Sequence, residues 1–439
     1  MKYLKKHVLV LLLVSFFGIL KLEAQNDKKK PFVLNLSEDG KQYIKFGMNT
    51  QIWARYTELN PNSAIGTNIV DHSEDIVIRR LRLQALGMLT ENIFFHVQIG
   101  QNNINFASNA PSAQLAILDL LGEYHFNDKL HIGGGLTGWG AGTTRYSAQS
   151  SSCQLTLDTP IYQQNINISS TFGNRNLSVY AKGLIKKLSY RFAITNPYVN
   201  NSVVGVNSSV SSNTPRAQYS AMTTYHFLET ESTAEPFNKG TYLGTKKVFN
   251  LGIGYMIQSK AMWHKSLIDP TVTEFDDMKV FGADAFYEAP LSSKGNALTL
   301  YGAFNNCNYG KNYIRTIATP NPAKPNANYS NSGNGFIGVG TGNIYYSQVG
   351  YLFGKSSNEK KTGRFQMFAS TEIAALEALD EPMTMYELGL NYYFKNNLGP
   401  KVTLGYQNRS ISENLDVITN KLTQTDRKGM VVLQMQVNF

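Results

Sequence analysis

The chain has few cysteines and, after its N-terminal segment, no long apolar run, and each lack excludes a common class of protein. Its 439 residues include only two cysteines, Cys153 and Cys307. Two cysteines cannot form a disulfide framework, although the sequence leaves open whether they pair. After the first 24 residues no apolar run approaches the roughly 20 residues that a membrane-spanning helix needs, which excludes a helical membrane protein. The one helix-like stretch, 371–379, is weak and also fits a strand end.

Motifs of enzymes are lacking as well. The sequence contains no GxSxG nucleophile elbow and no glycine-rich loop leading into a helix that would cradle phosphate. The histidines after the N-terminal segment do not show the spacing of a zinc site: His72, His96, His125, His131, His226 and His264. Asp119, Glu123 and His125 share one predicted face, which we interpret as a polar cluster rather than a general base. We therefore expect no catalytic residue, no metal and no cofactor.

The N-terminus has the layout of an export signal. Lys2, Lys5 and Lys6 precede an apolar run over 8–20, and the small residue Ala24 follows. This predicts a signal peptide over 1–24, because the apolar run is too short for a membrane anchor. No cysteine follows it, so a lipoprotein is not expected. The formal charge of +10 then favours anionic solutes or surfaces over nucleic acid.

What the sequence has in abundance is a two-residue rhythm. In the last segment Val431, Leu433, Met435 and Val437 alternate with polar or smaller residues up to the terminal Phe439. Comparable segments of about ten residues recur about 16 times, which is the length of a tilted strand crossing a bilayer. Hydrocarbon cannot hydrogen-bond the backbone, so such strands cross only as a closed ring. The sequence therefore predicts an all-β fold: a transmembrane antiparallel β-barrel over 41–439, after a short periplasmic tail over 25–40.

The connections between the predicted strands alternate in length. Tight turns such as 90–92, 126–129 and 185–187 alternate with long polar stretches at 59–73, 139–174, 196–214, 259–275, 306–341 and 411–427. Short periplasmic turns and long extracellular loops are typical of outer-membrane barrels. The segment 228–245 is the main exception, since it is long where a short turn is expected.

Charged side chains on the polar faces should line the interior. The cations are Lys45, Arg55, Arg80, Arg82, Lys182, Arg191, Arg216, Arg364, Lys401 and Arg409, and the anions are Asp119, Glu123, Asp284, Glu288, Glu372 and Glu387. Lumen cations favour anions, although charges of both signs also serve simply to keep a channel wet. Our candidate pore-lining and anion-binding residues are Arg80, Arg82, Arg55, Lys45, Lys182, Arg191, Arg364 and Arg409.

Two of these candidates stand out. Arg80 and Arg82 lie two residues apart on one face, where two guanidinium groups offer paired donors to an oxyanion. Arg79 is expected on the lipid side. If the 139–174 loop folds inward, Arg145 and Tyr146 lie near a constriction; a surface loop without a pore role is the alternative.

The chain resembles a bacterial outer-membrane porin. The pieces DIVIRRLRLQALGMLTENIFFHVQIG and RNLSVYAKGLIKKLSYRFAITNPY resemble hairpins of the phosphate-selective porin family of the O and P type, and QIWARYTELNP resembles porin-like proteins of Bacteroidota. The resemblance implies a trimeric channel in the outer membrane of a Gram-negative bacterium, inserted by the barrel-assembly machinery through the strand ending at Phe439. It implies passive diffusion of small hydrophilic solutes with a moderate preference for anions, phosphate among them. The alternatives are a barrel enzyme of the lipase or protease type and a barrel component of a secretion or adhesion apparatus.

Overall fold

Sixteen strands form the wall of the molecule in the computed structural model. The structure describes residues 32–108, 115–140, 142–148, 150–158, 175–200, 202–213, 216–318, 320–323, 332–354, 363–394, 398–416 and 421–438. The wall strands are β2 (Tyr43–Glu58), β5 (His72–Met88), β6 (Ile93–Ile104), β7 (Ala116–Asn127), β8 (Leu130–Thr137), β9 (Asn176–Ile185), β10 (Leu188–Thr195), β12 (Gln218–His226), β13 (Val248–Lys265), β14 (Thr273–Pro290), β15 (Ala297–Asn308), β18 (Gly342–Leu352), β19 (Arg364–Leu376), β20 (Met383–Tyr393), β21 (Lys401–Asp416) and β22 (Lys421–Asn438).

These strands close into a barrel. Each pairs antiparallel with the next along the chain, and the last strand returns to the first, with Asn49 opposite Asn438 and Thr57 opposite Met430. Closure leaves no free edge in the wall, which is what a bilayer demands of a sheet. The prediction of a closed antiparallel barrel of about 16 strands is confirmed. Phe439 itself lies outside the described residues.

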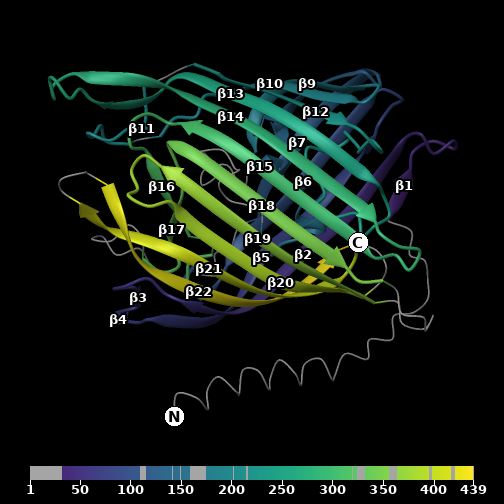
Figure 1. The fold of residues 1–439 in the computed structure, drawn as a ribbon. Coiled ribbons are helices and arrows are strands. Elements are labelled where there is room, and N and C mark those ends of the chain that lie inside the picture. Colours follow the sequence, from purple (N-terminus) through teal and green to yellow (C-terminus); the bar gives the residue numbers. More distant parts are fainter. Residues whose placement is uncertain are drawn as a thin grey trace, which may run out of the picture.

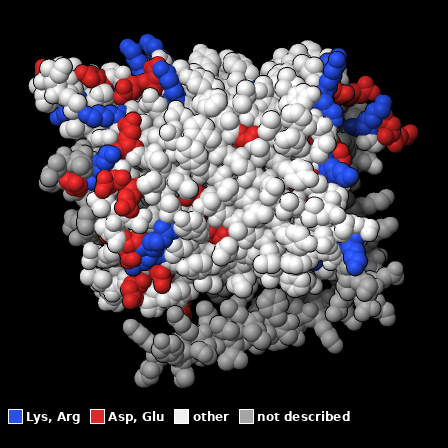
Figure 2. All heavy atoms as spheres, viewed as in Figure 1, with Lys and Arg blue, Asp and Glu red and all other residues white. Residues whose placement is uncertain are grey.

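The two faces of the wall differ in chemistry. On β13, Leu251, Ile253 and Tyr255 are exposed on the outside, whereas Asn250 and Gln258 are buried on the inside. Figure 2 shows the result as a broad band almost free of charge between two rims where lysine, arginine, aspartate and glutamate gather. An apolar outer band around a polar interior is the surface of a transmembrane barrel.

The two ends of the barrel also differ (Figure 1). At one end, which we call the short-turn end, two-residue turns join β7 to β8 and β9 to β10, and β1 (Val33–Asn35) pairs with the start of β2. At the other, the long-loop end, lie the small hairpin β3–β4 (Ala64–Ile65, Asn68–Ile69), the short strand β11 (Ser209–Val210) and the hairpin β16–β17 (Ile314–Ile317, Phe336–Gly340).

Two of the predicted long loops are wrong. The stretches 259–275 and 411–427 are largely strand, because β13 continues to Lys265, β14 begins at Thr273, β21 continues to Asp416 and β22 begins at Lys421. An 18-residue strand such as β13 extends about 60 Å, well beyond an apolar band of about 25 Å. These hairpins therefore project from the long-loop end, where polar side chains need not face lipid.

No described helix is both long enough and apolar enough to cross a membrane.

Candidate functional site

The interior of the barrel contains a loop that starts at the long-loop end of β8. We call its residues 138–158 the inner loop; positions 141 and 149 lie outside the described residues. It contains three short 3₁₀ turns, η3 (Gly138–Gly140), η4 (Arg145–Ala148) and η5 (Ser151–Cys153). Its side chains are nearly all buried, Tyr146 and Leu157 completely. The inner loop therefore runs within the barrel rather than over its surface.

Glycines in the wall make room for the inner loop. A Cβ atom on Gly254 of β13 would lie 2.5 Å from the Thr143 oxygen, and one on Gly282 of β14 would lie 2.7 Å from Thr144 Cγ2. Further round the wall, Gly350 and Gly405 meet leucines of the loop in the same way. Any side chain at these positions would push the loop away, so its path along the wall depends on them.

Polar side chains of the wall hold the loop backbone in place. Four of them donate to consecutive or nearby carbonyl oxygens: Gln51 to Ser151 (3.0 Å), Gln436 to Ser152 (2.9 Å), Lys401 to Gln154 (2.7 Å) and Asn391 to Leu155 (2.8 Å). These donors come from β2, β22, β21 and β20. A loop that has left the regular sheet thus keeps its buried carbonyl groups hydrogen-bonded.

The loop meets β5 at a pair of arginines. Asp158 contacts Arg79 through Oδ2 (2.5 Å to Nη2) and Arg80 through Oδ1 (2.5 Å to Nη2). Both arginines point inward because the register between β2 and β5 shifts here: Gln51 pairs with Arg80 and Ile52 with Ile78, leaving Arg79 as an extra residue. Such a bulge interrupts the strict alternation of side chains. The expectation that Arg79 faces lipid is therefore wrong.

A second segment enters the barrel from the short-turn end. Residues 228–245, which connect β12 to β13 and which we call the re-entrant segment, pair with the inner loop through backbone bonds. Asn238 N donates to Ala148 O (2.9 Å), Ser150 N to Asn238 O (2.9 Å) and Gly240 N to Cys153 O (2.8 Å). The unexpected length of this connection is explained by its position inside the barrel.

A buried ion pair fastens the two segments together. Arg145 of the inner loop contacts Glu231 of the re-entrant segment at 2.5 Å (Nη1 to Oε2) and 2.6 Å (Nη2 to Oε1). The guanidinium group also lies 3.7 Å from the centre of the Phe286 ring on β14. Tyr146, the other predicted constriction residue, accepts a hydrogen bond from Gln348 on β18 (3.0 Å) and packs on Tyr301.

The acids of these loops remain charged because of their cationic partners. Burial alone would raise the pKa of Asp158, but Arg79 and Arg80 outweigh it and lower this pKa to about 2. Burial likewise opposes ionisation of Glu231, yet the adjacent Arg145 holds the pKa of Glu231 below its ordinary value. Both contacts are therefore ion pairs at neutral pH.

Several other predicted cations also have partners. Arg55 forms two bonds to Asp75, Nε to Oδ1 at 2.5 Å and Nη2 to Oδ2 at 2.8 Å. Lys182 lies 3.0 Å from Glu123 and also donates to the Thr233 carbonyl oxygen of the re-entrant segment (2.8 Å).

The remaining predicted cations are scattered. Arg82 is buried and bonds to the Leu81 and Gln101 carbonyl oxygens and to Asn102. Arg364 donates to backbone carbonyl oxygens at the short-turn end, and Arg409 donates to the backbone carbonyl oxygen of Glu58 (2.9 Å) at the long-loop end. Lys45 is exposed near the start of β2, and Arg191 lies 3.0 Å from the Met222 sulfur. Arg80 and Arg82 lie together on β5, joined by Arg79, and Arg191 of β10 is paired with Lys182 of β9.

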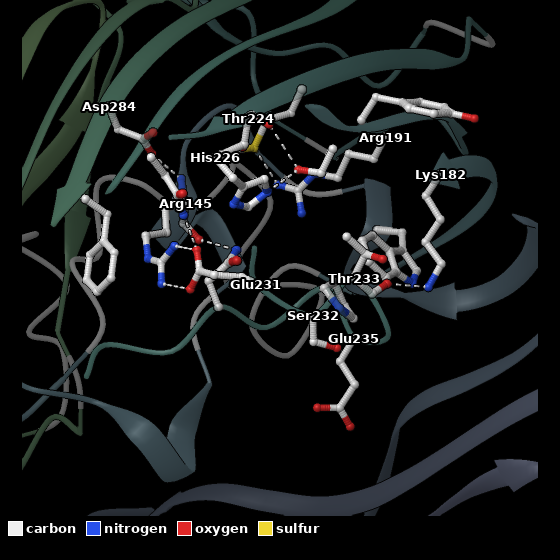
Figure 3. Close-up of a pocket in the computed structure, with 18 residues that line it drawn as sticks. Arg145, Lys182, Arg191, Thr224, His226, Glu231, Ser232, Thr233, Glu235 and Asp284 are labelled. Carbon is white, nitrogen blue, oxygen red and sulfur yellow. Dashed lines mark hydrogen bonds and ion pairs between the residues drawn. The ribbon is translucent and has the colours of Figure 1, made fainter. Parts of the chain in front are cut away.

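A cleft remains between the re-entrant segment and the wall (Figure 3). Lys182, Arg191 and Thr224 of the wall, Trp139 of the inner loop and Ser232 of the re-entrant segment are among its lining residues. Figure 3 shows Arg145 facing Glu231 and Lys182 reaching towards Thr233, whereas the Glu235 carboxylate points away from both. Cations, acids and an aromatic ring thus face one polar cleft inside the barrel.

One pair in this cleft bears on the enzyme alternative. His226 Nε2 lies 3.1 Å from Ser189 Oγ, the arrangement of a nucleophile and its base. Within the described part of the chain, however, no carboxylate is hydrogen-bonded to His226 Nδ1, and the polar side chain beside this ring is that of Asn250. A catalytic histidine is normally oriented by a carboxylate at that second nitrogen, so the pair lacks the carboxylate of a Ser-His-Asp triad.

Both cysteines are free and buried, Cys153 in the inner loop and Cys307 in β15. The structure therefore answers the open question of pairing in the negative.

Comparison with known proteins supports the fold. No protein-family model matches the chain, and no curated protein matches it. Among solved structures, the high-pH structure of Pseudomonas putida OprB matches with a TM-score of 0.52 and 10% identity, covering 90% of this chain and 94% of that chain. The outer membrane channel DcaP of Acinetobacter baumannii matches with a TM-score of 0.49 and 13% identity, covering 92% of this chain and 99% of that chain. At these identities the likeness concerns the architecture of the barrel alone.

Proposed function

We propose that this chain is an outer-membrane porin through which small hydrophilic solutes diffuse passively, with a moderate preference for anions. The observation that carries the proposal is a closed barrel whose polar interior holds an inward-folded loop fixed to the wall. A loop fastened in this way narrows the interior without abolishing its polar lining. Narrowing combined with a charged lining is how pores select among small solutes.

The preference for anions rests on the charge balance around β5. Arg79 and Arg80 share the single carboxylate of Asp158, so this group keeps one net positive charge. Arg82, two residues further along, forms no ion pair with any residue that the structure describes. By contrast, Arg55, Lys182 and Arg145 are each matched by a carboxylate. The wall around β5 is thus one place where cations outnumber carboxylates.

The environment of the barrel follows from the same proposal. The short-turn end would face the periplasm and the long-loop end the exterior of a Gram-negative cell. Insertion through the C-terminal strand, a trimeric assembly and phosphate as one of the solutes belong to the proposal as well.

Planar lipid bilayers provide the test. Purified, folded protein should produce stepwise increases in conductance, and in a potassium chloride gradient the reversal potential should shift towards that of chloride. Deleting 142–157 from the inner loop should raise the single-channel conductance several-fold, since the loop no longer occupies the interior. Bilayers that stay silent, although the protein shows the heat-modifiable gel migration of a folded barrel, would contradict the proposal.

A further inference from the structure

Two histidines and a glutamate converge inside the barrel near the short-turn end. Glu123 and His125 belong to β7, and His131 belongs to β8 across a two-residue turn. His125 and His131 are directly opposite each other in the register of the two strands. The register shifts between His125 and Asn127, so β7 has one residue more than β8 before the turn, and this irregular hairpin brings the two imidazole rings together.

The ligand atoms of these side chains face one another. His125 Nε2 lies 2.6 Å from Glu123 Oε1, and His131 Nδ1 lies 3.3 Å from the same oxygen. All three potential ligand atoms fall within 4.8 Å of one another, and no other such group of three occurs in the described parts of the chain. The Glu123 side chain is 1% exposed, whereas His125 and His131 are 24% and 15% exposed. The cluster is therefore buried on the wall side and open on the histidine side.

The two carboxylate oxygens of Glu123 have different neighbours: Oε1 faces the two histidines, and Oε2 contacts other side chains. Oε2 accepts hydrogen bonds from the Tyr180 hydroxyl (2.8 Å) and lies 3.0 Å from Lys182 Nζ. Tyr180 reaches this oxygen only because residue 133 is glycine: a Cβ there would lie 2.5 Å from Tyr180 Cζ. Carboxylates and rings that are oriented by outer hydrogen bonds are characteristic of metal sites.

We propose that Glu123, His125 and His131 bind one divalent transition-metal ion, for which zinc is the natural probe. Glu123 Oε1, His125 Nε2 and His131 Nδ1 would be the three protein ligands. Two imidazoles and one carboxylate form a ligand set that zinc, nickel and copper accept, whereas magnesium and calcium prefer oxygen alone. The fourth position would face the interior and be left to water, as in zinc sites with three protein ligands.

Two features of the structure oppose tight binding. The imidazole rings are stacked with centroids 3.8 Å apart and planes 8° apart, so they must rotate before both lone pairs can point at one ion. Lys182 also places a positive charge beside the carboxylate. We therefore expect a weak, exchangeable site, and we expect that Lys182→Gln raises its affinity on the order of tenfold, because a like charge within about 5 Å is removed.

The test is calorimetric titration of the chelator-treated full chain in detergent with zinc chloride. One zinc ion should bind per chain, and the double change His125→Ala with His131→Ala should lower the affinity at least tenfold. The matched control is His264→Ala, because His264 also lies beside carboxylates, but its two nitrogens face different ones, Glu274 (3.2 Å) and Asp276 (3.1 Å). The control should bind zinc as the unchanged chain does.

The absence of stoichiometric zinc binding, or equal loss of binding in the control, would overturn the proposal. If the double variant fails to show heat-modifiable migration, cobalt(II) absorption of the unchanged chain decides. Intense tetrahedral bands would support a site of two imidazoles and a carboxylate, and the weak spectrum of hydrated cobalt would refute it. Neither readout depends on whether the barrel conducts ions.

Discussion

At the scale of single residues, the interior charges differ in how completely they are compensated. Arg55 is matched by Asp75 and Lys182 by Glu123, so each pair is close to neutral for a passing solute. Arg82 instead bonds to neutral carbonyl and amide oxygens, which leave its charge in place. The field that an ion meets in a pore depends on this net charge rather than on the number of arginines.

Replacing Arg82 by glutamine is therefore expected to weaken anion preference. The permeability ratio of chloride to potassium should fall on the order of twofold, since a unit charge about 6 Å from an ion in water contributes less than 1 kcal/mol. Reversal potentials in a potassium chloride gradient measure the ratio. Lys41→Gln removes the same charge from an exposed turn outside the wall and should leave the ratio unchanged. An equal effect of both changes on the permeability ratio would mean that the charge of Arg82 does not set the anion preference.

Residue-level prediction from sequence succeeded for alternation and failed for exceptions to it. Arg80 and Arg82 lie on the inner face because strict alternation puts them there. Arg79 joins them only through a bulge, and Asp158 meets them only after its loop has crossed the interior. A bulge leaves no mark in hydrophobic periodicity, and the partner of a distant loop residue depends on tertiary structure.

At the scale of elements, the inner loop runs along the inside of the wall, contacts most of the strands from β13 round to β2, and reaches β5 at Asp158. Its last described residue, Asp158, is held by two guanidinium groups, and its middle is tied to the re-entrant segment by Arg145 and Glu231. The sequence offered inward folding of 139–174 as one of two alternatives, and the anomalous length of 228–245 was the only sign of the re-entrant segment. The sequence could not show which way that segment turns, since a polar connection fits both the periplasm and a wet interior.

The tie at Asp158 predicts how the channel responds to acid. The pKa of Asp158 is lowered from its ordinary 3.8 to about 2, so its ion pairs stabilise the folded loop by about 2 kcal/mol above roughly pH 4. This contribution is lost as the pH falls through about 2, when the carboxylate takes up a proton. The pKa of Glu231 is also held below its ordinary value by Arg145, so the second tie is likewise ionised at neutral pH.

The tie at Asp158 should therefore cause no change in single-channel conductance between pH 7 and pH 4 and a change below that range. Asp158→Asn should show at pH 7 the altered conductance that the unchanged chain shows in acid. Asp269→Asn is the control, because Asp269 lies in an exposed loop, and its lowered pKa comes from hydrogen bonds with Thr271 alone. A conductance step near pH 6 would show that another group sets the response.

At the scale of the whole molecule, the fold follows from the solvent on each side of the wall. Lipid demands closure and an apolar exterior, and water in the interior permits polar side chains at every second position. Both demands act on every strand, so the sequence repeats them sixteen times and reveals the architecture. The inner loop and the re-entrant segment do not face lipid, so neither closure nor an alternating pattern of apolar and polar residues is required of them. The sequence could not decide between an inward and an outward course for them, because a polar segment tolerates both a hydrated interior and the surface.

The same reasoning predicts how an outward charge affects stability. Leu388 lies at the middle of β20 and is 59% exposed on the outside of the wall, so Leu388→Arg places a guanidinium group at the centre of the apolar band. Its free energy of unfolding should fall by about 2–4 kcal/mol, the cost measured for arginine at the bilayer midplane. Ile69→Arg is the matched control, because Ile69 is 74% exposed in the β3–β4 hairpin at the long-loop end and should cost little. Guanidinium titration in lipid vesicles, followed by tryptophan fluorescence, gives both values. Equal costs at the two positions would mean that the outer surface of β20 does not face hydrocarbon. The barrel would then not cross a bilayer, and its polar interior would not serve as a path through one.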